Sequence, residues 1–113
     1  MPKTQIHTNR RMIDFFSTLA DETRLKIIAA LMERPRTVND IHEAIGKYTL
    51  TLSAVSHQLR HMADLDIIRY DKNGREKTFH LSDAFCWCIV REALNHYHDE
   101  KKCTACKPMR MKE

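Results

Sequence analysis

Apolar residues recur every three or four positions through the first half of the chain, a spacing typical of amphipathic helices. The pattern predicts four helices, over Asn9–Ala20, Glu22–Arg34, Val38–Ile45 and Leu52–Leu65. Asp21 and Thr37 are residue types that cap helix N-termini. Pro35 disfavours helix in the residue before it, and Gly46 suits a helix C-terminus. We expect Lys47–Thr51 to form the turn between the third and fourth helices.

The first and fourth predicted helices each have a clear apolar face. The face of the first helix consists of Met12, Ile13, Phe16, Leu19 and Ala20. The face of the fourth, which we expect to be buried, consists of Leu52, Val55, Leu59 and Met62. The opposite side of the fourth helix is polar and is therefore available for binding.

The hydrophobic period changes after position 66. Ile67–Tyr70 and Lys77–Leu81 are short and partly β-branched or aromatic, which favours strands. Asn73-Gly74 lies between them and predicts a two-residue hairpin turn in which both residues have positive φ. Beyond the hairpin, Asp83 is expected to cap a last helix that ends near Lys101.

Two short helices followed by a hairpin predict a winged helix-turn-helix. The expected fold is mostly α (α+β), with five helices and a two-stranded β-hairpin wing. The 113 residues suit one domain, and two glycines and three prolines agree with a helical chain. We expect residues 1–101 to form the DNA-binding and dimerisation domain and residues 102–113 a flexible basic tail.

The charge and composition narrow the class of protein. With a net charge of +4, the chain suits a polyanionic partner, although a merely soluble surface explains that charge as well. The sequence contains no apolar run of the roughly 20 residues that a membrane span needs and no signal peptide, so a cytoplasmic location is expected. Thiols stay reduced there, and the four cysteines are therefore interpreted as ligands, sensors or core residues rather than disulfides.

The polar face of the fourth helix has residues suited to reading DNA. Ser53, Ser56, His57 and Arg60 recur at spacings of three and four, and Gln58 flanks them. We expect the serines, His57 and Gln58 to meet base edges in a major groove and Arg60 to bind a phosphate. Any surface helix has a polar face, so this feature alone does not establish DNA binding.

The loop of the predicted hairpin is basic. Lys72, Arg75 and Lys77 surround its turn and are expected to contact the DNA backbone or an adjacent minor groove. A solvated turn is the simpler explanation of the loop taken alone. A polar helix followed by a basic wing is much more specific than either feature by itself.

Three stretches resemble one known family: LADETRLKIIAALM, SAVSHQLRHM and DIIRYDKNGREKTFHL. They are similar to the ArsR/SmtB family of winged-helix repressors over about Phe15–Leu81. The resemblance implies a homodimer, paired through its first and last helices, that binds double-stranded operator DNA. It also implies release by a metal ion, a metalloid or thiol oxidation. The turn over Lys47–Leu52 departs from the family, because it is about three residues longer than usual.

The resemblance also implies where a metal could bind. No cysteine precedes Cys86, so the family's site on the third helix and its second-helix redox cysteine are absent. A further family site joins the two last helices of the dimer. Asp83 matches its first ligand and His96 its third, whereas Phe85 replaces the second and Asp99 the fourth. Phenylalanine cannot bind a metal.

Cys86 and Cys88 flank the lost ligand position. In an antiparallel helix pair they would approach His96 of the partner subunit, and thiolate with imidazole suits zinc, cadmium, copper(I) or trivalent arsenic. Alternatively, Cys86 is a buried hydrophobic residue of the last helix, and His96 is an ordinary surface histidine. Cys103 and Cys106 have the spacing of a metal-binding pair or of a reversible disulfide.

These features predict a repressor that a thiophilic metal or metalloid releases from DNA. One alternative is a repressor controlled by oxidation of Cys103 and Cys106, and another is a DNA-binding protein without ligand control. An enzyme is disfavoured, because this cysteine pair lies in the tail rather than between a strand and a helix, as in thiol oxidoreductases.

Overall fold

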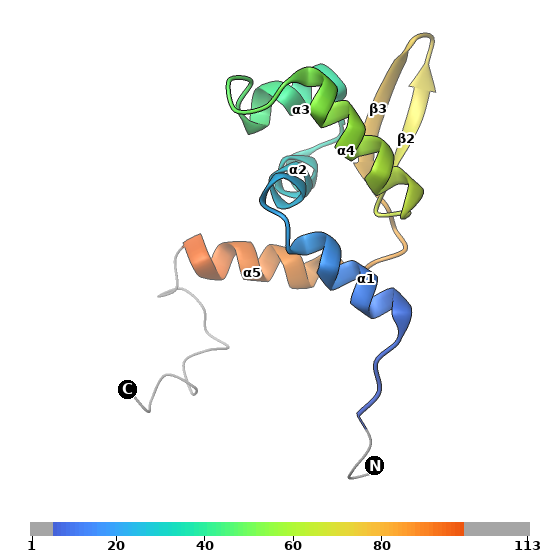
Figure 1. Ribbon diagram of the computed structural model, residues 1–113, viewed down its shortest axis with the longest axis vertical. Coiled ribbons are helices and arrows are strands. Elements are labelled where there is room, and N and C mark those ends of the chain that lie inside the picture. The colour runs from blue at the N-terminus through green and yellow to red at the C-terminus, as the bar shows by residue number, and fades with distance from the viewer. Residues whose placement is uncertain (1–5, 99–113) are drawn as a thin grey trace. The chain divides into compact units, whose positions relative to one another are not determined.

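The computed structural model describes residues 6–98. The chain divides into two compact units, with the boundary between Ser82 and Asp83. Figure 1 labels the elements. The first unit contains α1 (Arg10–Leu19), α2 (Glu22–Glu33), β1 (Arg36–Thr37), α3 (Val38–Ile45), α4 (Leu52–Asp64), β2 (Ile68–Asn73) and β3 (Glu76–Leu81). The second contains α5 (Cys88–His98). The five predicted helices and the hairpin are thus confirmed.

Each helix of the first unit begins at a side-chain cap. The side chains of Asn9, Asp21, Thr37 and Thr51 accept hydrogen bonds from the backbone N–H three residues later, over 2.8–3.2 Å. Such a bond satisfies an N–H group that has no partner within the helix. Because these caps are local, the first and last residues of α1 to α4 each differ from the sequence prediction by no more than one residue.

The hairpin belongs to a three-stranded antiparallel sheet of order β1-β3-β2, rather than standing alone. The additional strand, β1, is two residues long and pairs Arg36 with Phe79. So short a strand has no hydrophobic period by which the sequence could reveal it. Because β1 pairs with β3, the hairpin is joined to the two residues that directly precede α3.

The hairpin turn lies one residue later than the sequence suggests. Asn73 still pairs with Glu76, which leaves Gly74 and Arg75 as the two turn residues. Gly74 has a φ of 69°, whereas neither Asn73 nor Arg75 is left-handed. This matches a type II′ turn, in which glycine occupies the first central position. The prediction of an Asn73-Gly74 turn is therefore wrong by one position.

The core of the first unit is formed where α2, α3 and α4 meet the sheet. Its most deeply buried apolar side chains are Ile27, Ile28, Ile41, Val55, Leu59, Met62, Ile67 and Ile68. Leu52, predicted to be buried with this stripe, is 40% exposed instead. It is the first residue of α4, beyond the part of that helix, Val55 to Met62, that reaches the core.

The buried guanidinium of Arg36 fixes the start of α3. Its Nε donates to the carbonyl of Ala30 at 2.8 Å, its Nη1 to Asp40 at 3.1 Å and its Nη2 to Glu33 at 2.5 Å. These bonds tie the end of α2 to the first turn of α3. Arg34 also pairs with Asp40, and its hydrogen bond is the largest effect that lowers the pKa of that carboxyl.

Within α1, Phe15 and Thr18 are buried, whereas Met12, Ile13 and Phe16 of the predicted apolar face are exposed. Phe16 retains 51% of its accessible surface. Among residues 6–98, no helix has both the length and the hydropathy that crossing a bilayer requires.

The last helix starts at Cys88, four residues after the position that follows the predicted cap Asp83, so Asp83 is not its cap. The carbonyl of Trp87 accepts a hydrogen bond from the N–H of Arg91 in the first turn of this helix. Cys86 precedes the helix and is exposed in this chain, so its interpretation as a buried residue of the helical stripe is wrong.

Candidate nucleic-acid interface and thiol site

The side of α4 opposite the core carries the predicted reading residues. Val55, Leu59 and Met62 are buried, which fixes the rotation of the helix about its axis. Ser53, His57 and Arg60 are consequently exposed, and Ser56 is half-buried. The expected polar face is thus accessible along most of its length.

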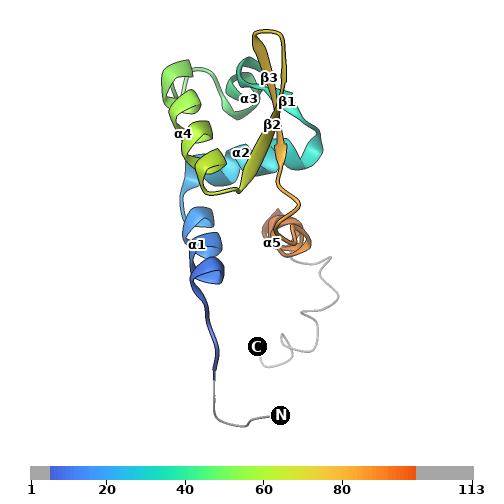
Figure 2. The ribbon, with the colours of Figure 1, turned by 90° about the vertical axis from the view of Figure 1, so that its right-hand side faces the viewer.

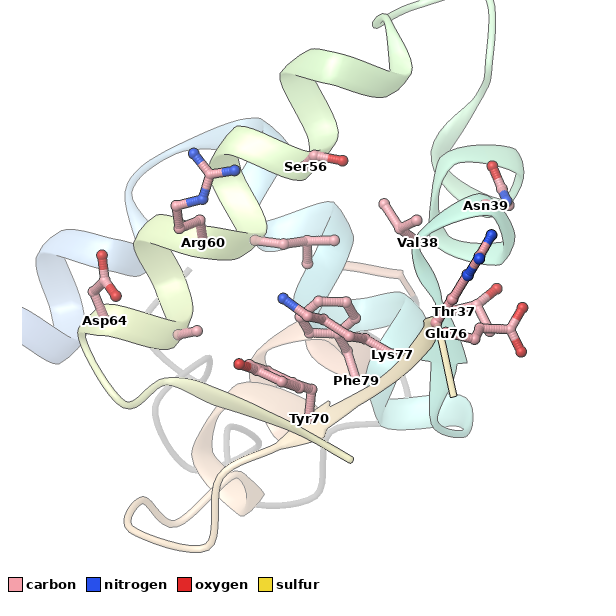
Figure 3. Close-up of a pocket in the computed structure, with 13 residues that line it drawn as sticks. Thr37, Val38, Asn39, Ser56, Arg60, Asp64, Tyr70, Glu76, Lys77 and Phe79 are labelled. Atoms are coloured by element: carbon pink, nitrogen blue, oxygen red, sulfur yellow. The ribbon is translucent and has the colours of Figure 1, made fainter. Parts of the chain in front are cut away.

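A hollow of about 520 Å³ separates α4 from the hairpin, and we call it the wing hollow. Its lining comes from three elements: Thr37, Val38 and Asn39 at the start of α3; Ser56, Leu59, Arg60, Ala63 and Asp64 of α4; and Tyr70, Arg75, Glu76, Lys77 and Phe79 of the hairpin. Figure 3 shows Ser56 and Arg60 across this hollow from Tyr70 and Lys77. The structure therefore gathers four predicted DNA-binding residues in one place: Ser56, Arg60, Arg75 and Lys77.

An aromatic platform supports the basic residues of the hairpin. The Lys77 ammonium lies 4.5 Å from the centre of the Tyr70 ring, which packs on Phe79 at 5.5 Å. Lys77 is also paired directly across the strands with Lys72. Two like charges in that position weaken a hairpin. The pairing of Lys72 with Lys77 therefore concentrates positive charge on the hairpin without stabilising the sheet.

A second hollow, of about 450 Å³, lies at the other end of the α4 face, and we call it the α2 hollow. It is lined by Thr23, Leu50, Thr51, Ser53, Ala54, His57 and Gln58. Ser53 and His57 thus line a different hollow from Ser56 and Arg60. We call the accessible polar side of α4, with Ser53, Ser56, His57 and Arg60, the reading face. It is bordered by α2 on one side and by the hairpin on the other.

Gln58 is half-buried and already has a partner. Its Oε1 accepts a hydrogen bond from Arg24 Nε at 3.2 Å, which leaves the two amide N–H donors for another ligand. Sequence reasoning missed Arg24, although one signal was present. A cation in the first turn of a helix opposes the helix dipole, so an arginine at the third position of α2 calls for a separate role.

Cys86 and Cys88 lie together at the start of α5, and both are exposed. The N–H of Cys88, which hydrogen-bonds the Cys86 sulfur, is the largest effect that lowers the pKa of the Cys86 thiol. The thiol of Cys88, the N–H of Ile89 and the charge of Arg91 act in the same direction. Arg91 Nη2 also contacts the Cys88 sulfur at 3.6 Å. This arrangement favours a thiolate, the form of cysteine that binds soft metals.

The other predicted ligands are placed apart or lie outside the described residues. Asp83 is exposed in the turn before α5, and the His96 ring packs edge-on against Tyr97 at 4.9 Å. Within residues 6–98, no three His, Cys, Asp or Glu side chains are gathered as a metal site needs. Asp99, Cys103 and Cys106 lie beyond these residues. The two thiols thus fit a soft metal in type, and a complete site needs ligands from a second chain or from the tail.

Comparison with known proteins identifies the family. Residues 21–70, from α2 to the first strand of the hairpin, match the family model described as "Bacterial regulatory protein, arsR family". The chain is 33% identical to a transcriptional repressor SmtB homolog from Synechocystis over 80% of its length. It is 39% identical over 73% of its length to the transcriptional regulator NmtR from Mycobacterium tuberculosis. These alignments span 66% and 64% of the two relatives, slightly less than two thirds.

A third relative and a solved structure extend the match. A cadmium resistance regulatory protein, a CadC homolog from Staphylococcus aureus, is 33% identical over 74% of this chain and 68% of its own length. The solution structure of apo-NmtR has a TM-score of 0.64 and 30% identity, and the match covers 89% of this chain and 86% of that one. All of these relatives are described as transcriptional regulators or repressors, in agreement with the expectation that this chain is not an enzyme. The chain belongs to the ArsR/SmtB family of winged helix-turn-helix transcriptional regulators.

Proposed function

We propose that this protein is a sequence-specific repressor that binds double-stranded operator DNA as a homodimer. The observation that carries the proposal is the exposed polar face of α4, bordered by the basic hairpin across the wing hollow. A major groove is wide enough to admit an α-helix. The hairpin would then lie over the flanking phosphates.

Each group has a role that follows from its place. Ser53, Ser56 and His57 meet base edges, because they lie on the first two turns of α4, the part of a reading helix that contacts bases. Gln58, oriented by Arg24, offers its amide N–H groups to a base. The cationic side chains bind phosphates, which position the protein without reading sequence. These cations are Arg60, Lys72, Arg75 and Lys77.

Dimerisation through the first and last helices is supported by two exposed apolar surfaces. One lies on α1 and includes Met12, Ile13 and Phe16, and the other lies on α5 and includes Ile89 and Tyr97. Leaving such surfaces in water is unfavourable. Covering them in a symmetric dimer would present two copies of α4 to the two halves of an operator. Since the target is genomic DNA, we propose that the protein acts in the cytoplasm.

We further propose that a thiophilic metal or metalloid ion releases the DNA. Cys86 and Cys88 would be the central ligands, with Asp83 and His96 of the same or the partner subunit. Asp99, Cys103 and Cys106 complete the proposed ligand set. A relative that is named for cadmium resistance supports a soft metal as the signal. A bound ion would hold the thiolates together and favour a dimer arrangement that fits DNA less well, and DNA must weaken ion binding by the same factor.

An anaerobic titration tests this function. A short duplex is first selected by the protein from a random-sequence pool. Fluorescence anisotropy of this duplex then measures binding of the reduced full-length protein while Cd²⁺ is added. We expect salt-sensitive binding without metal and release with it. Cys86→Ser and Cys88→Ser should lose the release and keep metal-free affinity within about twofold, because they lie outside the proposed DNA surface.

Matched variants and oxidation separate the alternatives. His96→Ala tests the imidazole ligand. A protein with both Cys103→Ser and Cys106→Ser, treated with diamide instead of Cd²⁺, tests control by tail oxidation. If wild type and the Cys86 and Cys88 variants all release DNA equally with Cd²⁺, these thiols are not the sensor. Absence of salt-sensitive binding to any duplex would refute the repressor itself.

A further inference from the structure

The turn between α3 and α4, residues 46–51, is held firmly at both ends, and we call it the α3–α4 turn. Gly46 ends α3 with a φ of 103° and donates its N–H to the Glu43 carbonyl at 3.3 Å. The N–H of Thr49 then donates to the Gly46 carbonyl at 2.9 Å. A Cβ at Gly46 would lie 3.0 Å from the Thr49 hydroxyl oxygen, in addition to requiring a left-handed backbone.

The second half of the turn is attached to both helices. His42 of α3 donates from Nε2 to the carbonyl of Leu50 at 2.6 Å. Thr51 caps α4 by accepting from the N–H of Ala54 at 3.0 Å. The backbone on both sides of Lys47 and Tyr48 is therefore constrained. A turn held in this way presents its side chains in one arrangement, which lowers the entropy lost on binding.

The tip of the turn exposes three consecutive hydrogen-bond donors. Tyr48 retains 94% of its accessible surface, and the neighbouring Lys47 and Thr49 are also exposed. The Lys47 ammonium lies 5.8 Å from the centre of the Tyr48 ring. Lysine, tyrosine and threonine are all side chains that donate to DNA phosphates. Residues 46–51 contain no carboxylate that would oppose such a contact.

The turn continues the surface that the reading face occupies. Leu50 and Thr51 line the α2 hollow together with Ser53 and His57. Figures 1 and 2 show the α3–α4 turn and the tip of the β2–β3 hairpin at the same end of the first unit, away from α1. The hairpin borders the Arg60 side of α4, whereas the turn extends from its N-terminus. The two elements therefore bracket the reading face.

We propose that the α3–α4 turn is a third DNA-contacting element, in which Lys47 and Tyr48 bind backbone phosphates next to the point where α4 enters the groove. This inference rests on the proposed function. It assigns to the turn a contact with the duplex itself rather than with another protein, because its donors and its positive charge adjoin the reading face. The turn adds affinity and orientation, and base reading stays with α4.

The test measures operator affinity as a function of salt for full-length variants. The probes are the short duplex selected by the wild type and a scrambled duplex of the same composition. Lys47→Ala should flatten the slope of log affinity against log salt by about 0.9, since one fewer counterion is released. Tyr48→Phe loses only a hydroxyl and should weaken binding on the order of 2- to 10-fold with an unchanged slope. Both should leave the preference for the selected over the scrambled duplex unchanged.

Lys26→Ala is the matched control. Lys26 lies on α2, pairs with Glu22 at 3.2 Å and lines neither of the two hollows that border α4. We expect it to change neither slope nor affinity. If wild type binds with a steep salt slope and the Lys47 and Tyr48 variants behave like the Lys26 variant, the inference is wrong and the repressor assignment stands. If wild type shows no salt-sensitive binding, both fail.

Discussion

Arg24 Nε and Gln58 Oε1 are joined by a hydrogen bond of 3.2 Å between the first turn of α2 and the reading helix α4. Their positions in the chain are 34 residues apart. The bond holds the Gln58 amide in one orientation, with its N–H donors left for a base. We propose that Arg24 is a positioning residue for Gln58 on the reading face.

Removing Arg24 should relax sequence preference at the base that Gln58 meets. We expect Arg24→Ala and Gln58→Ala each to reduce discrimination against single-base changes at one operator position, by roughly 1–3 kcal/mol at most. Affinities of both single variants and of the double variant, measured across a set of single-base operators, complete the comparison. The double variant should be little worse than either single variant, because the two residues act as one unit. Additive losses, or losses spread evenly over all positions, would contradict this role.

Asp40 should make stability depend on pH in the acidic range. The hydrogen bond from Arg34 is the main reason why the pKa of Asp40 is lowered, and Arg36 adds to the effect. A carboxyl with a lowered pKa in the folded state stabilises the protein above its unfolded value, about 3.9. This stabilisation is lost as the pH falls from there through the folded-state pKa.

Asp40→Asn provides the measurement. Its thermal midpoint should lie below that of wild type at pH 7, and the difference should shrink as the pH falls below about 3.9. Asp64→Asn is a suitable control, since Asp64 lies at the end of α4 and none of the ion pairs described here includes it. A difference between wild type and Asp40→Asn that stays constant as the pH is lowered through the acidic range would exclude the ion pairs as its cause.

Replacing Lys72, which is opposed by Lys77, should affect thermal stability and DNA binding in opposite directions. Because they are directly opposed across the hairpin, Lys72→Ala removes a repulsion and should leave the thermal midpoint unchanged or slightly raised. The same change should weaken operator binding and flatten its salt slope by about 0.9. Glu76→Gln serves as a control of opposite sign, since it removes a negative charge beside the wing hollow and should strengthen binding. Weaker binding by Glu76→Gln would argue against a phosphate contact there.

Phe16→Glu should separate the proposed dimer. Phe16 is 51% exposed on the apolar face of α1, and a carboxylate there would have to be desolvated on association. Sedimentation velocity should show a shift from dimer to monomer, with loss of operator affinity. Tyr48→Glu, which also places a carboxylate on an exposed aromatic position, should remain dimeric. A dimeric Phe16→Glu protein would remove α1 from the proposed interface.

Local signals in the sequence determined most of the first unit. The limits of α1 to α4 follow from caps such as Asp21 and Thr37, whose hydrogen bonds reach only three residues along the chain. The rotation of α4 follows from the spacing of Val55, Leu59 and Met62. Both features depend on near neighbours, so the exposed polar face of this helix was predictable from the sequence.

Tertiary structure decided what depends on distant partners. The hairpin turn moved to Gly74–Arg75 because the register is set along both strands rather than by one favourable dipeptide. The last helix begins at Cys88 rather than directly after Asp83, so the presence of a capping residue type did not by itself fix where this helix starts. The contact of Arg24 with Gln58 and the exposure of Tyr48 arise from the packing of α2, α3 and α4, which no spacing along one segment encodes.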